Sequence, residues 1–411
     1  MDTDVVVIGG GIAGSALAAV LAGEGLGVTV LERQHCYTDQ VRGENLHPWG
    51  VAEAQRLGLA SVFLDAGAHL VGELVNFGEV GEGRDGQPEP IPLGALVEGV
   101  AGELNLAHPA ACEALASQAE KAGATLRRGV THVEVTLGRP PGVTFREQGE
   151  QASITPRLVV GADGRSSRVR RQAGIELEHA AAPHLITGLL VDDLDVDPHR
   201  NQVATGPDVW QVTFPQGGGR ARVYLCYDTT DPQRFAGPAG PERFLEAAAI
   251  DTLPKAGEPW RHATPAGPCR SFPADDTWTS RPYTEGVVLL GDAAGHTNPL
   301  IGQGLALALR DVRALAEGLL EQPHWDTALL ADYGHQRAER LRRARLLGQL
   351  HAEVWVAFGP EARERRRRVE QRWQQHPELL SAVVGILTGP EATDPQVYTP
   401  DFARRYLGAV G

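Results

Sequence analysis

The chain has 411 residues, enough for two or three domains, and its 42% hydrophobic and 22% charged residues are typical of a soluble globular protein. Its net charge of −14 disfavours nucleic acid as a partner, because phosphate binding requires a net basic surface. No run approaches the roughly 20 apolar residues that span a bilayer, and no basic segment precedes the first apolar run. We therefore expect no integral membrane segment, no signal peptide and a cytoplasmic location.

The histidines and cysteines show no metal-binding pattern. None of the 14 histidines has the spacing of a zinc motif, and the four cysteines contain no CxxC pair. We predict no metal site and four free thiols, at Cys36, Cys112, Cys226 and Cys269.

The predicted elements begin with a strand–helix–strand unit over residues 4–32. Val5–Ile8 is a continuous apolar run, as expected of a buried parallel strand, and a helix rich in small apolar residues follows it. The remaining elements predicted for this α/β part are a helix at 109–121, ribbon strands at 125–137 and 143–146, core strands at 158–162 and 287–290, and a helix from 302 to about 320.

Two stretches have a different pattern. Residues 70–100 are punctuated by Gly and Pro, and residues 184–275 contain several β-like runs, two of which flank the Gly-rich turn at 215–219. Such antiparallel strands, inserted between parts of a nucleotide-binding fold, predict a sheet that covers the substrate. From residue 325 onward the pattern is helical.

The sequence thus predicts an α/β fold, in which a Rossmann-like cofactor-binding domain carries an inserted antiparallel β-sheet substrate domain and a C-terminal helical region. The predicted boundaries are 1–70, 101–180 and 276–330 for the discontinuous cofactor domain, 71–100 and 181–275 for the insert, and 331–411 for the helical region.

A dinucleotide-binding pattern lies at the end of the first strand. Gly9 permits a tight turn, Gly11 lets the backbone approach a pyrophosphate, and Gly14 permits close packing of helix on strand. The helix that begins at Ile12 and Ala13 then offers its positive end to the phosphates. Glu32, at the end of the second strand, can accept hydrogen bonds from a ribose diol.

Two further motifs follow at the ends of later core strands. Residues 161–164 read GADG, and a Gly-Asp pair at 291–292 leads to a loop that contains Pro299, Gly302 and Gly304. In this order and spacing, the three motifs resemble those of the FAD-dependent aromatic-hydroxylase superfamily. The Arg42-Gly43-Glu44 segment and Gly295 resemble the branch that is close to flavin halogenases and geranylgeranyl reductases.

The resemblance implies FAD as the cofactor and assigns several of its contacts. Asp163 would support the pyrophosphate, Asp292 would bind near the ribityl chain and pyrophosphate, and Arg42 would also contact FAD. A turn-capping role is the alternative for Asp163. Together, pattern and resemblance predict FAD binding by Gly9, Gly11, Ile12, Ala13, Gly14, Glu32, Arg33, Arg42, Val133, Asp163, Asp292, Gly302, Gly304 and Leu305.

The resemblance implies a monooxygenase. It would use NAD(P)H and O2 to hydroxylate or epoxidise a small organic substrate, aromatic or polyketide-like, through a flavin C4a-hydroperoxide. Only one dinucleotide-binding pattern is visible, so either NAD(P)H docks transiently on the FAD fold or a separate flavin reductase delivers the electrons.

Other functions are compatible with parts of the pattern. The same branch features allow a flavin-dependent reductase of isolated double bonds, and a non-enzymatic flavin-binding protein is a third alternative. A halogenase is disfavoured, because the family's active-site lysine and its Trp-x-Trp-x-Ile-Pro segment are missing.

Candidate catalytic and substrate residues adjoin these motifs. His47, His296 and Pro299 lie next to flavin-proximal segments, and either histidine could tune proton delivery or could be structural. Trp210, Phe214 and Tyr224 on the inserted sheet could line a substrate pocket, although ordinary sheet packing explains them about as well. The insert and the C-terminal helices carry no signature that identifies the substrate.

Overall fold

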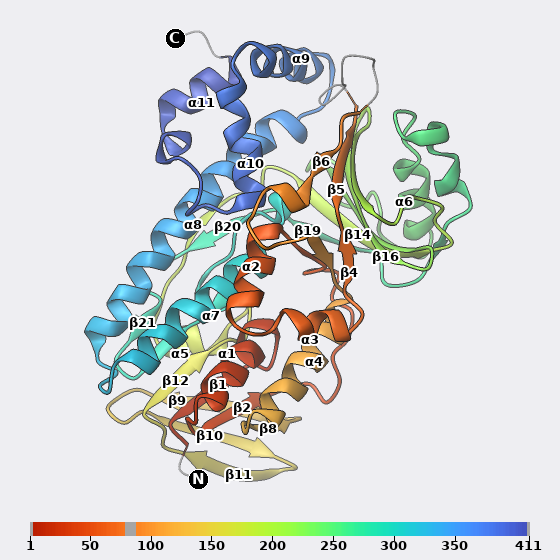
Figure 1. The fold of residues 1–411 in the computed structure, drawn as a ribbon. Coiled ribbons are helices and arrows are strands. Elements are labelled where there is room, and N and C mark those ends of the chain that lie inside the picture. The colour runs from red at the N-terminus through yellow and green to blue at the C-terminus, as the bar shows by residue number, and fades with distance from the viewer. Residues whose placement is uncertain (1–2, 79–87, 409–411) are drawn as a thin grey trace.

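The computed structural model describes residues 3–78 and 88–408. It confirms the predicted fold class, with an α/β domain, a second sheet that is largely antiparallel, and a set of C-terminal helices (Figure 1). The predicted insert segment 71–100 includes residues 79–87, which lie outside the described residues.

A six-stranded sheet forms the centre of the α/β domain, with the order β21-β22-β12-β1-β2-β8. Its buried strands are short apolar runs that are covered on both faces, by helices on one face and mainly by a three-stranded ribbon on the other. The strands are β1 (Val5–Ile8), β2 (Val28–Glu32), β8 (Thr125–Arg128), β12 (Leu158–Gly161), β21 (Tyr283–Thr284) and β22 (Val287–Leu289).

Strand register brings the three motifs together. Ile8 pairs with Gly161, and Gly161 pairs with Leu289, all in parallel. The carboxyl ends of β1, β12 and β22 therefore lie side by side, where ligands bind in open α/β sheets.

The prediction of one ribbon over 125–137 and 143–146 is wrong in part. β8 pairs in parallel with β2 and extends the central sheet, because the turn at Gly129 and Val130 redirects the chain. The separate ribbon consists of β9 (Thr131–Thr136), β10 (Gly142–Glu147) and β11 (Glu150–Ile154).

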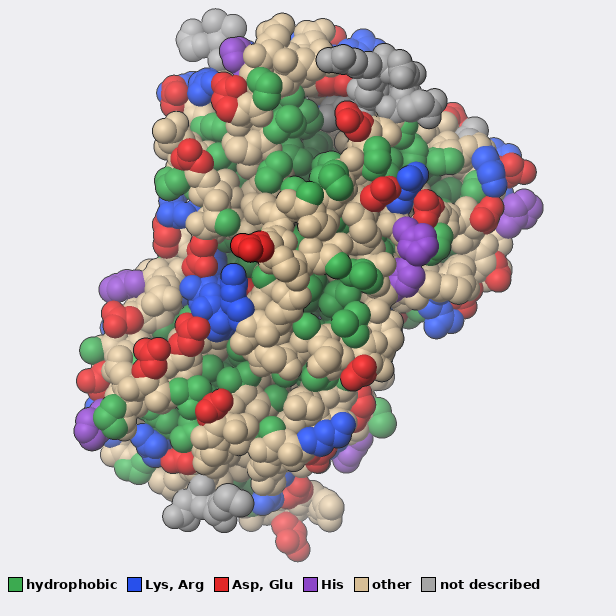
Figure 2. Space-filling view, viewed as in Figure 1, with side chains coloured by type: hydrophobic (Ala, Val, Ile, Leu, Met, Phe, Trp, Pro, Cys, Tyr) green, Lys and Arg blue, Asp and Glu red, His purple; other side chains and the backbone are tan. Residues whose placement is uncertain are grey.

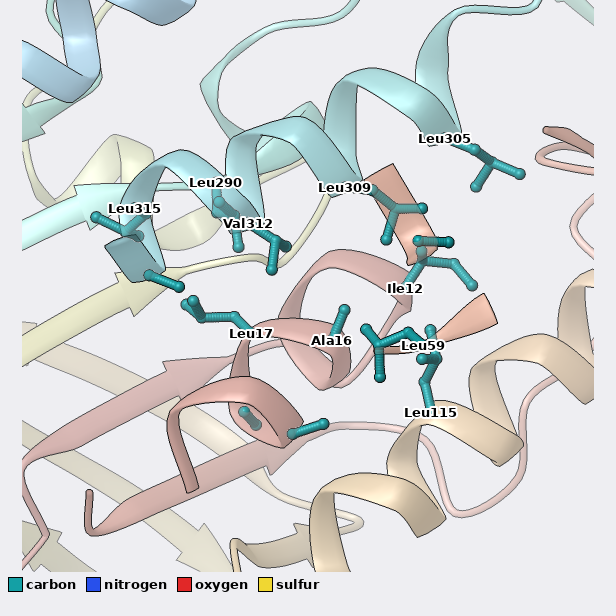
Figure 3. Packing of buried hydrophobic residues seen from close by; sticks show 14 of the residues in the cluster. Ile12, Ala16, Leu17, Leu59, Leu115, Leu290, Leu305, Leu309, Val312 and Leu315 are labelled. Atoms are coloured by element: carbon teal, nitrogen blue, oxygen red, sulfur yellow. The ribbon is translucent and has the colours of Figure 1, made fainter. Parts of the chain in front are cut away.

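Three helices pack over one another beside the central sheet (Figure 3). Small residues such as Ala16 on α1 (Ile12–Gly23) let α4 (His108–Lys121) and α7 (Gly304–Glu321) approach closely. Leu17, Leu115 and Leu309 are among the side chains that fill the space between them. This core holds the amino ends of α1 and α7 next to the motif-bearing strand ends.

The second sheet has the order β18-β14-β17-β16-β15-β5-β6, with β19 also paired to β14. One of its faces packs on α6 (Gly240–Ala248) in a separate hydrophobic cluster. The strands are β5 (Glu73–Phe77), β6 (Ile91–Pro92), β14 (Leu185–Asp192), β15 (Arg200–Thr205), β16 (Trp210–Gly217), β17 (Arg220–Tyr227), β18 (Thr264–Pro265) and β19 (Arg270–Pro273).

The C-terminal helices pack on the other face of this sheet and on the α/β domain. They are α8 (Thr327–Trp355), α9 (Pro360–Gln375), α10 (Ser381–Thr388) and α11 (Pro400–Leu407). One hydrophobic cluster joins them to Trp210 on β16 and to Leu300 and Ile301, which follow Pro299. The helices thus form a third wall around the point where the two sheets meet.

Short elements connect these parts. They are α2 (Pro48–Arg56), α3 (Ala60–Asp65), α5 (Arg168–Gln172), β3 (Asn45–Leu46), β4 (His69–Val71), β7 (Glu103–Asn105), β13 (Glu178–Ala180) and β20 (Asp276–Trp278).

Acidic and basic side chains are interspersed on the face shown in Figure 2, with hydrophobic side chains visible between them. Within residues 3–78 and 88–408, no helix combines the length and the apolar character needed to cross a membrane.

Candidate active site

A cavity of about 370 Å³ lies where the α/β domain, the second sheet and the C-terminal helices meet. Its lining includes residues from distant parts of the chain, from the first Gly-rich turn to α10. Of the predicted cofactor residues, those that line it are Gly11, Ile12, Ala13, Arg42, Asp292, Gly302, Gly304 and Leu305.

The amino ends of α1 and α7 both open into this cavity. Neither helix has a side-chain cap on its first N–H groups, which leaves these donors for a ligand. A Cβ added at Gly11 would enter open space, whereas one at Gly14 would lie 2.0 Å from the carbonyl oxygen of Gly9. Gly14 therefore serves packing, and Gly11 leaves room at a helix amino end that favours anions. The pyrophosphate of FAD fits the amino end of α1, and its ring system fits the amino end of α7.

The other predicted cofactor residues lie outside the lining. Glu32 is buried at the end of β2, where its carboxylate accepts hydrogen bonds from the backbone N–H of Gly10 and of Gln34 at 2.6 and 2.7 Å. Arg33 is exposed, and Val133 lies on the ribbon strand β9. Gly9 forms the turn that precedes Gly11, with a positive φ of 106°.

Asp163 caps a helix. Its carboxylate accepts hydrogen bonds from the Ser167 hydroxyl and from the backbone N–H of Arg168 and Val169 at the start of α5. These are the contacts of the turn-capping alternative, and they hold the GADG turn in place.

Asp292 faces an arginine that the motif analysis did not single out. Arg165 Nε lies 3.2 Å from Asp292 Oδ2, and both line the cavity together with Arg42. Two cations therefore flank one carboxylate at the cofactor end of the site. Such a cluster suits a diphosphate, which needs more positive than negative neighbours.

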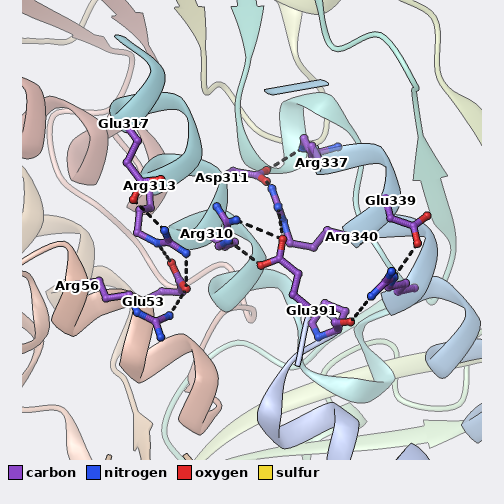
Figure 4. Close-up of polar contacts among 12 residues, drawn as sticks. Glu53, Arg56, Arg310, Asp311, Arg313, Glu317, Arg337, Glu339, Arg340 and Glu391 are labelled. Atoms are coloured by element: carbon purple, nitrogen blue, oxygen red, sulfur yellow. Dashed lines mark hydrogen bonds and ion pairs between the residues drawn. The ribbon is translucent and has the colours of Figure 1, made fainter. Parts of the chain in front are cut away.

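A buried arginine on α8 holds the Gly-Asp loop (Figure 4). Arg337 forms an ion pair with Asp311 on α7 at 2.8 Å and donates hydrogen bonds to the carbonyl oxygens of Gly291, Ala294 and Gly295. Sequence reasoning missed Arg337, because it lies among several arginines of one long helix. No local pattern distinguishes it from its exposed neighbours.

His47 is fixed by both of its ring nitrogens. Nδ1 lies 2.7 Å from Glu103 and Nε2 lies 2.9 Å from the carbonyl oxygen of Ile301. Burial alone would lower the pKa of His47, but the Glu103 carboxylate and the two hydrogen bonds outweigh it and raise the pKa. With an acceptor at each nitrogen, His47 donates to both and anchors the loop that contains Gly302.

His296 is held differently. Its Nδ1 lies 2.9 Å from the Thr277 hydroxyl and its Nε2 lies 3.2 Å from Asp275. Burial, together with Arg165, lowers its pKa against the opposing effect of Asp292 and Asp275. His296 and Pro299 both line the cavity, and Pro299 is the first residue of the short helical turn Pro299–Ile301.

Trp210, Phe214 and Tyr224 all line the cavity from the second sheet. Trp210 stacks on Trp355 at the end of α8, with ring centroids 5.6 Å apart and planes within 3°. The C-terminal lining was not predicted, because α8 and α10 carry no recognisable motif. It consists of Trp355, Val383, Ile386 and Leu387.

Glu44 is a buried carboxylate in the same lining. It accepts a short hydrogen bond from the Tyr224 hydroxyl and lies 3.4 Å from Arg222, which also pairs with Asp39 at 2.6 Å. Burial raises the pKa of Glu44 to about 7, although Arg222 acts in the opposite direction. Burial and Glu44 also raise the pKa of Tyr224 well above its usual value.

The fold and the cavity together define a flavin-binding protein of the Rossmann-like type. Residues 2–345 match the family model described as FAD binding domain, and the chain belongs to that family. FAD is the cofactor of the site.

Two relatives and one solved structure show how far the similarity extends. The chain is 31% identical over 407 residues to 3-amino-4-hydroxybenzoate 2-monooxygenase of Streptomyces cremeus, with 96% of this chain and 98% of that protein covered. It is 27% identical over 328 residues to squalene monooxygenase of Mus musculus, with 78% of this chain covered. It spans 55% of that longer protein, about half its length. The crystal structure of p-nitrophenol 4-monooxygenase from Pseudomonas putida has the same fold, with a TM-score of 0.79, 20% identity, and 94% and 98% of the two chains covered.

Proposed function

We propose that the protein is an FAD-dependent monooxygenase that uses NAD(P)H and O2 to hydroxylate or epoxidise a small organic molecule. The observation that carries this proposal is the continuity of the cavity. Its lining passes from the amino ends of α1 and α7 to an apolar chamber between β16, β17 and α10. The similarity to two monooxygenases supports the same conclusion.

The residues at the cofactor end of the cavity would bind and orient FAD. Gly11 and the amino end of α1 would receive the diphosphate, with Arg42 and Arg165 nearby. The 302–305 turn at the amino end of α7 would face the flavin ring, and its N–H groups favour negative charge there. Reduced FAD supplies the activation of O2 that oxygenation requires.

The remaining residues would shape the chamber and exclude water from it. His47 keeps the carbonyl oxygen of Ile301 in place, so we assign it a positioning role. Pro299 begins the short turn whose next two residues, Leu300 and Ile301, pack with the C-terminal helices. Apolar side chains from three parts of the molecule would keep water out of the chamber, which would limit unproductive side reactions there.

Rapid mixing of the anaerobically reduced holoprotein with oxygenated buffer tests the proposal. We expect a transient species whose spectrum differs from those of both oxidised and reduced flavin, and a longer lifetime for it when a ligand fills the chamber. Direct reoxidation under both conditions would contradict oxygenation. It would favour the alternative, a reductase of isolated double bonds.

A further inference from the structure

The two ends of the cavity differ in charge. Arg42 and Arg165 are the arginines of its described lining, and no lysine occurs there. Both interact with Asp292 at the end that receives the diphosphate. When FAD is bound, its diphosphate would therefore pair with both arginines.

The opposite end is apolar. Its walls are formed by Trp210, Val212 and Phe214 from β16 and by Trp355, Ile386 and Leu387 from the C-terminal helices. Besides Asp292, the carboxylates of the lining are Glu44 and Glu103, and Glu103 is already paired with the protonated His47. Arg222 lies behind Glu44, outside the lining, and is engaged by Asp39 and Glu44. A carboxylate on the ligand would thus meet apolar walls and acidic neighbours, which is costly for a buried anion.

Tyr224 presents a polar group to a ligand at this end of the cavity. Its side chain extends from β17 toward Glu44, and its hydroxyl donates a hydrogen bond to that carboxylate. The Tyr224 hydroxyl has one proton, so its oxygen can then only accept a hydrogen bond from a ligand. The elevated pKa of Tyr224 is consistent with this arrangement, since the hydroxyl keeps its proton.

We infer that the chamber takes an uncharged, mainly apolar molecule with one hydrogen-bond donor, a hydroxyl or amino group, which Tyr224 accepts while Glu44 orients Tyr224. The inference rests on the proposed function, since it names the substrate class of that same site. It also separates this chain from its Streptomyces relative, whose name specifies a benzoate.

Three matched ligands test this on the FAD-loaded full chain: 2-naphthol, 2-methoxynaphthalene and 6-hydroxy-2-naphthoate. The readout is the change in flavin absorbance on titration, which requires no turnover. At pH 8.5 we expect 2-naphthol to bind roughly 5–10 times more tightly than the methoxy compound, as one hydrogen bond provides. The carboxylate should bind at least about 10 times more weakly than 2-naphthol.

Three variants make the test specific. Tyr224→Phe should reduce the affinity of 2-naphthol to that of the methoxy compound. Glu44→Gln should abolish the preference, because a glutamine amide can donate to Tyr224 and turn its proton toward the ligand. Tyr227→Phe is the matched control, since that hydroxyl bonds to Thr187 and Ser271 outside the chamber, and it should leave the preference unchanged.

Three results would overturn the inference: binding of the carboxylate as tight as that of 2-naphthol, persistence of the hydroxyl preference in Tyr224→Phe, or no binding by any of the three ligands. Failure of the oxygen-mixing experiment is a separate outcome. It would leave a flavin enzyme of another reaction with the same ligand class, because the titrations read binding alone.

Discussion

We expect that one methyl group added at Gly11 would keep a diphosphate from the amino end of α1. Its backbone has a φ of −71°, which alanine adopts freely, and the added Cβ would enter the open cavity. We expect Gly11→Ala to fold normally and to lose FAD. The flavin-to-protein ratio after dialysis should fall at least about tenfold, the equivalent of ~1.4 kcal/mol.

Gly23, at the other end of the same helix, provides the control, since a Cβ there also meets open space. Gly23→Ala should keep its flavin and gain roughly 0.5–1 kcal/mol of stability from the helix preference of alanine. Equal flavin content in the two variants would exclude a diphosphate at Gly11.

Glu44 makes stability depend on pH. Its pKa in the folded chain is about 7, above the ordinary value of 4.5, so its contribution is complete below pH 4.5 and is lost as pH rises through 7. Glu44→Gln removes this loss. Its stability relative to the parent chain should therefore rise between pH 5 and pH 8, by up to about 3 kcal/mol at ~1.4 kcal/mol per pKa unit.

The titrating groups near Glu44 keep one protonation state over this range. The pKa values of Arg222 and Tyr224 are both raised, and burial lowers the pKa of His108 on α4 to about 4. Urea unfolding of both FAD-saturated proteins at the two pH values measures the difference, and other titrating groups cancel between them. A difference that does not change with pH would show that Glu44 is ionised throughout.

At the scale of elements, α8 holds the Gly-Asp loop in place through Arg337. Arg337→Leu would free three loop carbonyl oxygens and remove one of the two arginines that neutralise Asp311. Breaking such a buried pair costs roughly 3–5 kcal/mol, and the loosened loop should also bind FAD more weakly. Thermal unfolding and flavin titration report the two effects separately.

Arg342 on the same helix is the matched control. It is about half exposed and pairs with Glu339 three residues earlier, so Arg342→Leu should cost less than about 0.5 kcal/mol. A loss as small as this in Arg337→Leu would mean that the loop is held by its own backbone.

Local patterns account for what could be predicted at this scale. Runs such as Val5–Ile8 and the glycines beside them predict buried strands and tight turns from a few adjacent residues. The strand β8 was misplaced because pairing with β2 depends on residues almost 100 positions away. Trp355 and Arg337 were missed, and the role of Glu44 was not predicted, for a related reason. Their roles come from partners on other elements, such as Trp210, and no periodicity in the sequence records those contacts.

At the scale of the whole molecule, the chamber forms where three parts that are distant in the sequence meet. Its walls come from β16 and β17, from the 299–305 turn and from α8 and α10, and one hydrophobic cluster joins them. A ligand that fills the chamber should therefore stabilise all three parts together, because each loses the freedom to open locally.

Hydrogen exchange of the FAD-loaded chain, with and without 2-naphthol, measures this coupling. We expect slower amide exchange in α10, in the Pro299–Ile301 turn and in β16, in proportion to the fraction of chain with ligand bound. The β9–β11 ribbon contributes no residue to the described lining, so its exchange should be unchanged. Protection confined to β16 and β17 would show that the ligand binds on the sheet alone, and that the C-terminal helices do not close the chamber over it.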